Sequence, residues 1–190
     1  MAGLGTSDLS ETLRLISGIR PAAILYGCTS ATLTHGVKFD QELAEQIKVS
    51  SGAVSITAAS SLVAAMKALH VTKIGFASPY LGEVNDQAVQ FFASEGITTV
   101  HRADIGKALG NYGQGELKPE EITKLALRAD GPDVQAIVLS CTDMRAVETI
   151  GAVEAQTGKP VITSNQAMVF QLCKALGLRF PARPWGTLLT

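Results

Sequence analysis

Two stretches of the chain share one pattern and decide the fold: residues 24–30 read ILYGCTS, and residues 137–143 read IVLSCTD. In each, an apolar run that is typical of a buried strand ends at a cysteine followed by a threonine. Each is followed by a helical pattern, a second apolar run (GAVSIT or GKPVIT) and a helix that ends in KAL. This twofold internal repeat predicts two similar α/β lobes related by a pseudo-twofold axis, with the two cysteines paired across one cleft.

The rest of the chain alternates between short apolar runs and helical patterns. Strands are expected at 22–26, 53–57, 73–77, 97–101, 136–139 and 161–163. Helices are expected at 9–19, 39–48, 60–69, 85–95, 120–129, 147–156 and 166–176. This order is typical of parallel sheets covered by helices on both faces. We expect a first lobe over residues 1–80, with residues 165–190 packing back on it, and a second lobe over residues 81–164.

The composition restricts the class of protein. The 190 residues are 46% hydrophobic and 17% charged, which suits one large domain or two small lobes. The net charge is -1 and no run of Lys or Arg stands out, which excludes the charge pattern of a nucleic-acid-binding protein. No apolar run is long enough to span a bilayer and no signal-peptide pattern is present, so we expect a cytoplasmic protein. Three widely separated cysteines argue against a disulfide framework and against a zinc site.

The positions of Cys28 and Cys141 favour catalysis. Ligands of open parallel sheets bind at the carboxyl ends of the strands, where both cysteines are expected. Backbone N–H groups near a helix start favour a thiolate and can also bind a carboxylate. One cysteine can then attack the substrate or remove a proton, while the other delivers a proton from the opposite face. A lone cysteine at a strand end is more often a small buried apolar residue, but the repeat of Cys-Thr at matched positions favours function.

Hydroxyl groups near the cysteines are candidates for binding the substrate. They belong to Thr29, Ser30, Tyr80 and Thr142. Such donors can stabilise the charge that develops on a carboxylate during enolisation. If enough of them converge, neither a metal nor an organic cofactor is needed.

Other residues have weaker support as parts of a site. Asp143 and Arg145 fit a substrate contact or a solvated helix start equally well. His35 follows the first cysteine loop and is an outside candidate for the cleft. Cys173 lies within a helical pattern and is expected in the core. The glycine-rich stretch at 106–115 lacks a phosphate-loop motif, and we expect a mobile loop there.

Several of these segments together resemble a known family. GCTSAT at 27–32, LSCTDM at 139–144 and SPY at 78–80 resemble the aspartate/glutamate racemase superfamily, in particular its branch of maleate cis-trans isomerases and arylmalonate decarboxylases. The resemblance extends over nearly the whole chain and is strongest at 60–86 and 150–178. It implies two flavodoxin-like (Rossmann-like) lobes with a cleft between them and no cofactor. Members of this branch begin with a further strand, so we expect the first lobe to lack its N-terminal strand and carboxylate loop.

The resemblance also implies roles for individual residues. In the isomerases of this branch, the cysteine that matches Cys28 adds to the double bond, and the one that matches Cys141 handles the proton. In the decarboxylases, only the position that matches Cys141 is a cysteine. The carboxylate- or oxyanion-binding positions of the family match Thr29, Ser30, Tyr80 and Thr142.

The sequence therefore predicts a cofactor-independent, cysteine-dependent isomerase of a small (di)carboxylate, similar to maleate cis-trans isomerases or Asp/Glu racemases. We expect a homo-oligomer without nucleic-acid or membrane partners. An arylmalonate-type decarboxylase is one alternative. A non-catalytic protein that binds a small acid is an alternative of another class, and a nucleotide-binding protein follows from the fold alone.

Overall fold

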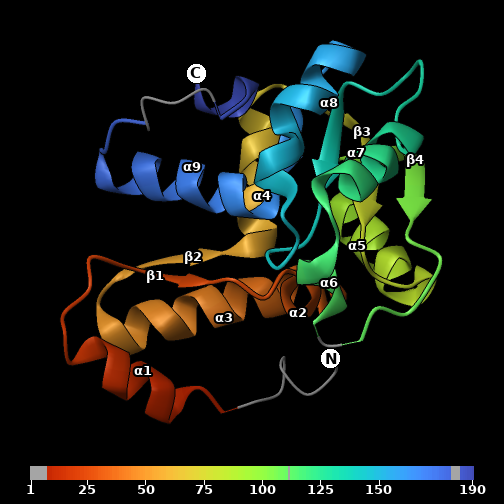
Figure 1. Cartoon of the computed structure of the whole chain (residues 1–190). Helices are drawn as coiled ribbons and strands as arrows, with labels where there is room; N and C mark the ends of the chain where they lie inside the picture. The colour runs from red at the N-terminus through yellow and green to blue at the C-terminus, as the bar shows by residue number, and fades with distance from the viewer. Residues whose placement is uncertain (1–7, 111, 181–184) are drawn as a thin grey trace.

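The described strands form two separate parallel sheets (Figure 1). The structure is a computed structural model that describes residues 8–110, 112–180 and 185–190. The smaller sheet pairs β1 (Ala23–Tyr26) with β2 (Val54–Thr57). The larger sheet has the order β4-β3-β5-β6 and consists of β3 (Lys73–Ser78), β4 (Thr98–Asp104), β5 (Ala136–Leu139) and β6 (Val161–Thr163). This architecture confirms the predicted α/β class.

Helices alternate with these strands along the chain. They are α1 (Ser10–Ser17), α2 (Thr29–Thr34), α3 (Gly36–Ser51), α4 (Ala58–Ala68), α5 (Gly82–Ser94), α6 (Gly113–Glu116), α7 (Pro119–Arg128), α8 (Ile150–Thr157) and α9 (Ser164–Leu176), with short 3-10 helices at Ala146–Thr149 and Thr187–Leu189. Two of them differ from expectation, because α2 and α6 lie where connecting segments were predicted. Strand β4 also continues to Asp104, beyond its expected end at residue 101.

Both faces of the larger sheet are buried. On one face, Phe76 and Val138 pack among residues of α4 and α5. On the other face, Ile137 and Leu139 pack among residues of α7 and α8. Burial on both faces explains why these strands read as continuous apolar runs rather than as alternating patterns.

The internal repeat of the sequence is present in the structure. Tyr26 of β1 pairs with Thr57 of β2, and Leu139 of β5 pairs with Thr163 of β6 in the same way. Both threonines then cap the following helix, because their side chains accept hydrogen bonds from backbone N–H groups of α4 and α9. These two equivalent helices pack against each other (Figure 1). The repeat therefore corresponds to two equivalent strand-helix units.

The strand pairing differs at one point from the expected lobe ranges. Strand β3 lies within 1–80 but pairs with β4 and β5, so the sheets divide between β2 and β3. Its burial explains this placement, since Ile74, Phe76 and Ala77 need neighbours on both faces. From the opposite end of the chain, α9 packs on β2 through Met168 and Leu172. The division into lobes at 1–80, 81–164 and 165–190 stays a prediction.

None of the helices in the described part of the chain is both long enough and apolar enough to cross a membrane.

Candidate active site

Cys28 lies between the end of β1 and the start of α2. Its backbone is extended (φ -83°, ψ 92°), and its carbonyl accepts hydrogen bonds from the N–H and the hydroxyl of Thr32. These bonds hold the turn that carries the thiol. The residue is half-buried, and its sulfur lies 3.7 Å from the hydroxyl oxygen of Ser30. Cys28 is therefore less buried than Cys141 and lies on a turn that is fixed by hydrogen bonds from Thr32.

Cys141 follows β5 at the equivalent position of the second repeat, but its environment differs. Its side chain is 1% exposed, and its sulfur accepts a hydrogen bond of 3.1 Å from the Tyr80 hydroxyl. Burial raises the pKa of the Cys141 thiol, and hydrogen bonds from Tyr80 and from the backbone N–H groups of Asp143 and Met144 offset part of this rise. The net effect keeps Cys141 protonated at neutral pH.

Tyr80 joins the two cysteine segments. It follows β3, it is buried, and besides its bond to Cys141 its hydroxyl has a hydrogen bond with Ser30, whose own hydroxyl lies close to the Cys28 sulfur. Burial, followed by the neighbouring Cys141, raises the pKa of Tyr80, so its hydroxyl remains a donor. Side chains from the ends of β1, β3 and β5 thus meet at one place, as the rule for parallel sheets predicts.

The two predicted threonines have different roles. The hydroxyl of Thr142 donates to the carbonyl of Gly27 at 2.6 Å, and so connects the turn after β5 to the end of β1. Thr29 is 1% exposed, and its hydroxyl has no hydrogen-bond partner among the described residues. Thr142 therefore joins the turns that follow the two sheets, whereas the Thr29 hydroxyl is buried without a hydrogen-bond partner among the described residues. The roles of the predicted site residues in binding and catalysis stay predictions.

Of the other candidates, Asp143 contacts Cys141 through its backbone N–H, whereas His35, Arg145 and Cys173 bond to residues outside this cluster. The ring of His35 packs on Phe39, and its Nδ1 lies 2.9 Å from the carbonyl of Ala31. Arg145 forms an exposed ion pair with Glu148, and Cys173 is buried in α9. In the described ranges, no three His, Cys, Asp or Glu side chains form a group that could hold a metal ion.

Three residues of the site surroundings were missed by the sequence reasoning. Asn165, at the start of α9, donates its amide to the carbonyl of Thr142 at 3.1 Å. Ser78 and Asn85 contact the backbone of Tyr80. The repeat offered no signal for Asn165, because the first copy has alanine at the equivalent position after Thr57. Ser78 belongs to the SPY segment, but a serine before Pro-Tyr does not by itself indicate such a contact.

Comparison with known proteins identifies the family. The sequence profile of the arylmalonate decarboxylase family matches residues 8–189. The chain belongs to the arylmalonate decarboxylase family. Among the relatives of this family member is the maleate isomerase of Pseudomonas putida, with 26% identity over 171 residues that cover 87% of this chain and 68% of the relative.

Solved structures of maleate isomerases share the fold of this chain. The crystal structure of a cysteine-to-alanine variant of a Pseudomonas putida maleate isomerase with maleate matches with a TM-score of 0.90 and 25% identity, over 96% of this chain and 75% of that one. A cysteine-to-serine variant of the Nocardia farcinica maleate cis-trans isomerase, with a covalently bound succinylcysteine intermediate, matches with a TM-score of 0.88 and 22% identity, over 95% and 76%. The predicted resemblance and the predicted fold class are confirmed.

Proposed function

We propose that this chain is a cofactor-independent isomerase of a small dicarboxylate, with Cys28 and Cys141 as its catalytic groups. The observation that carries the proposal is the Tyr80 hydroxyl, which donates to the Cys141 sulfur and is hydrogen-bonded to Ser30, whose own hydroxyl oxygen lies 3.7 Å from the Cys28 sulfur. Tyr80 and Ser30 therefore link two thiols that follow strands of separate sheets. The maleate isomerases among its relatives support a maleate-like substrate.

The proposed reaction proceeds through a thioether. Cys28, as thiolate, adds to one alkene carbon, and the π electrons move to the adjacent carbon and its carboxylate. Cys141 donates its proton to that adjacent carbon, which leaves a C–C single bond that rotates. Return of the proton to Cys141 and expulsion of the Cys28 thiolate then give the trans diacid. The succinylcysteine in the Nocardia farcinica enzyme supports an intermediate of this kind.

The different environments of the two thiols suit these two roles. The nucleophile must reach the substrate, and Cys28 is the more exposed thiol. The proton donor must be neutral before the reaction, and burial raises the pKa of Cys141. When Cys141 has given up its proton, the Tyr80 hydroxyl stabilises the resulting thiolate. The Thr29 hydroxyl, buried and without a partner in the described residues, could bind a substrate carboxylate.

A decarboxylase is the second candidate, because the matching family is named for arylmalonate decarboxylase. Loss of carbon dioxide would leave an enediolate, which Cys141 alone could protonate. A racemase would instead use both thiols as opposed bases. Product analysis by NMR in deuterated water, with maleate, aspartate, glutamate, hydantoins and arylmalonates, separates these reactions. Formation of fumarate from maleate supports the isomerase, and carbon dioxide loss from arylmalonates without fumarate formation contradicts it.

Single substitutions at the two thiols test the proposal directly. We expect Cys28→Ser and Cys141→Ser each to lower kcat for maleate isomerisation by about 10²–10⁴-fold, because each removes a group that transfers a proton or forms a bond. Cys173→Ala is the matched control, since Cys173 packs in α9, and it should keep the wild-type rate. Wild-type turnover in Cys28→Ser would contradict the isomerase mechanism.

Alkylation distinguishes an enzyme from a non-catalytic small-acid binder. We expect iodoacetamide to label Cys28 faster than Cys173, and maleate to protect it. Labelling of Cys28 as slow as that of Cys173 would instead favour the binding protein.

A further inference from the structure

The backbone of Tyr80 is held from both sides by two buried polar side chains. Its N–H donates to the hydroxyl oxygen of Ser78 at 3.1 Å, and its carbonyl accepts from the side-chain amide of Asn85 at 3.2 Å. Ser78 and Asn85 are also bonded to each other, since the Ser78 hydroxyl donates to Asn85 Oδ1. Both side chains are fully buried. The two residues therefore hold the two peptide groups on either side of the Tyr80 Cα atom.

Each polar atom of the Asn85 side-chain amide has a hydrogen-bond partner. Besides Tyr80, its Nδ2 donates to Asp104 Oδ1 at 2.7 Å. Asp104 Oδ2 accepts from Arg102 at 2.8 Å, and Arg102 in turn pairs with Asp86 at the surface. Both N–H groups of Asn85 and its oxygen thus have partners, so the side chain has one orientation that satisfies all of them. The hydrogen bond to Asp104 holds Asn85 against β4.

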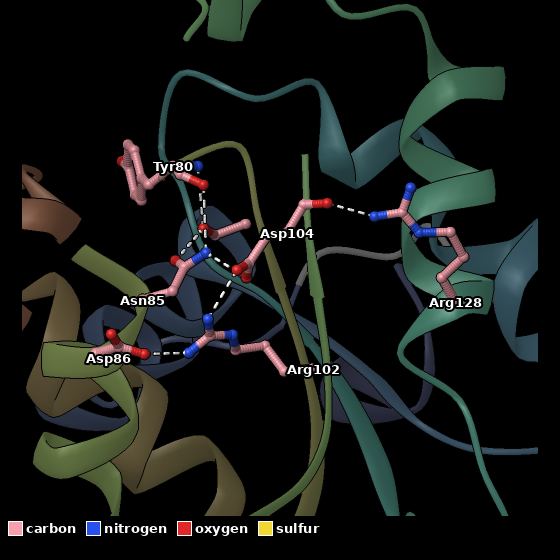
Figure 2. A network of polar contacts seen from close by, with 7 residues as sticks. Tyr80, Asn85, Asp86, Arg102, Asp104 and Arg128 are labelled. Carbon is pink, nitrogen blue, oxygen red and sulfur yellow. Dashed lines mark hydrogen bonds and ion pairs between the residues drawn. The ribbon is translucent and has the colours of Figure 1, made fainter. Parts of the chain in front are cut away.

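The backbone and the ring of Tyr80 face different neighbours. Figure 2 shows the Tyr80 ring pointing away from the network, whereas its backbone faces Asn85. The ring carries the hydroxyl that donates to Cys141, so a change in the backbone moves that hydroxyl relative to the sulfur. Hydrogen bonds weaken steeply with poor geometry, and a displacement of about 1 Å in an active site can lower the rate about 10²-fold.

We propose that Asn85 is a positioning residue that fixes the backbone of Tyr80 and thereby directs the Tyr80 hydroxyl onto Cys141. The inference rests on the proposed role of Cys141 as proton donor. Asn85 does not contact the reacting groups itself. It acts through Tyr80. Ser78 holds the N–H of Tyr80, and Asp104 holds the side-chain amide of Asn85.

The test measures Cys141 without requiring turnover. In a Cys28→Ser/Cys173→Ser background, Cys141 is the remaining thiol, and its ionisation is followed against pH by the loss of its S–H stretching band in the Raman spectrum. The midpoint of this curve reports the thiol pKa, and no reagent has to enter the buried site. We expect Tyr80→Phe to raise the midpoint by about half to one pH unit, as the loss of one hydrogen bond to the thiolate predicts.

Asn85→Ala should raise the midpoint in the same direction. If Asn85 acts through the Tyr80 hydroxyl, the double variant Tyr80→Phe/Asn85→Ala should shift the midpoint no further than Tyr80→Phe alone. In the otherwise unchanged protein, Asn85→Ala should lower kcat about 10-fold or more with little change in KM. Asp86→Asn, on the next residue of α5, removes only the exposed pair with Arg102 and should leave both values unchanged.

Two results would overturn the inference: a folded Asn85→Ala variant with the wild-type midpoint, or a shift that adds fully to that of Tyr80→Phe. If circular dichroism shows that Asn85→Ala does not fold, Ser78→Ala replaces it and is judged by the same criteria, because Ser78 holds the N–H of the same residue, Tyr80. Failure of the proposed isomerase would appear separately, as unchanged turnover in Cys28→Ser.

Discussion

Gly75 shows how closely one residue can be constrained by the helix that packs on it. It lies in β3, and a Cβ added there would come within 2.0 Å of the carbonyl oxygen of Ala129, directly after α7. Backbone atoms cannot move aside as a flexible side chain can. Gly151 in α8 is the opposite case, because a Cβ added there meets no described atom within 4 Å.

The contrast between these glycines gives a prediction. Gly75→Ala should lower the free energy of unfolding by about 1–3 kcal/mol through overpacking. Gly151→Ala should raise it by about 0.5–1 kcal/mol, because alanine is the better residue inside a helix. Urea denaturation of both variants measures the difference. Equal effects of the two substitutions would show that α7 does not pack on β3 as closely as described.

The residues of the site differ in how far the sequence could predict them. Cys28 and Cys141 were accessible to prediction because a repeat and a strand end mark both positions. Tyr80 and Ser30 lie next to such strand ends. Asn85 instead comes from inside α5, and its role depends on how that helix is placed beside Asp104 of β4. No local pattern encodes that placement.

The start of helix α9 is specified by its own residues. Thr163 accepts a hydrogen bond from the N–H of Gln166, and the Gln166 side chain in turn reaches the N–H of Thr163. This capping box satisfies two backbone donors that the helix itself leaves free. Because Asn165 lies in the same first turn and bonds to Thr142, the cap also supports the turn that carries Cys141.

Removal of the cap should therefore destabilise the protein. Thr163→Ala is expected to lower the free energy of unfolding by about 1 kcal/mol, whereas Thr163→Ser, which keeps the accepting oxygen, should cost less. Thermal or urea unfolding measures both. A Thr163→Ser variant as unstable as Thr163→Ala would mean that packing of the methyl group, rather than the cap, accounts for the loss.

The elements that sequence reasoning missed are short and poor in helix-forming residues. Helix α2 has the sequence TSATLT, in which three of six residues are threonine, and threonine has a low helix propensity. It forms where its residues are buried, from Thr29 to Leu33, so tertiary packing outweighs propensity. Helix α6 contains two glycines within four residues. The long periodic helices and the apolar strands, by contrast, were predicted to within a few residues.

At the scale of the whole molecule, the buried thiol of Cys141 and the buried phenol of Tyr80 make the free energy of unfolding depend on pH. Burial raises the pKa of both Cys141 and Tyr80, so the folded protein holds these protons more tightly than the unfolded chain. Their contribution is complete below the unfolded pKa values, about 8.5 for cysteine and about 10 for tyrosine. This contribution to stability is lost as the pH rises above the unfolded pKa values toward the higher pKa values of the folded protein.

We therefore expect the free energy of unfolding to fall with rising pH from about pH 8.5 upward. A Cys141→Ala/Tyr80→Phe variant should show a shallower decline, because it lacks both groups. Urea denaturation at a series of alkaline pH values measures the two curves. Parallel curves would mean that these groups titrate alike in the folded and unfolded states.

The hydrogen bond from Thr142 to Gly27 has a consequence for the order of assembly. It joins residues 115 positions apart, and it lies beside both thiols. During synthesis, the first cysteine leaves the ribosome well before the second, and contacts of such long sequence separation form late. A chain that has been made only as far as residue 140 therefore contains Cys28 without Cys141. The two cysteine turns can therefore be joined only after the chain has been made at least as far as Thr142.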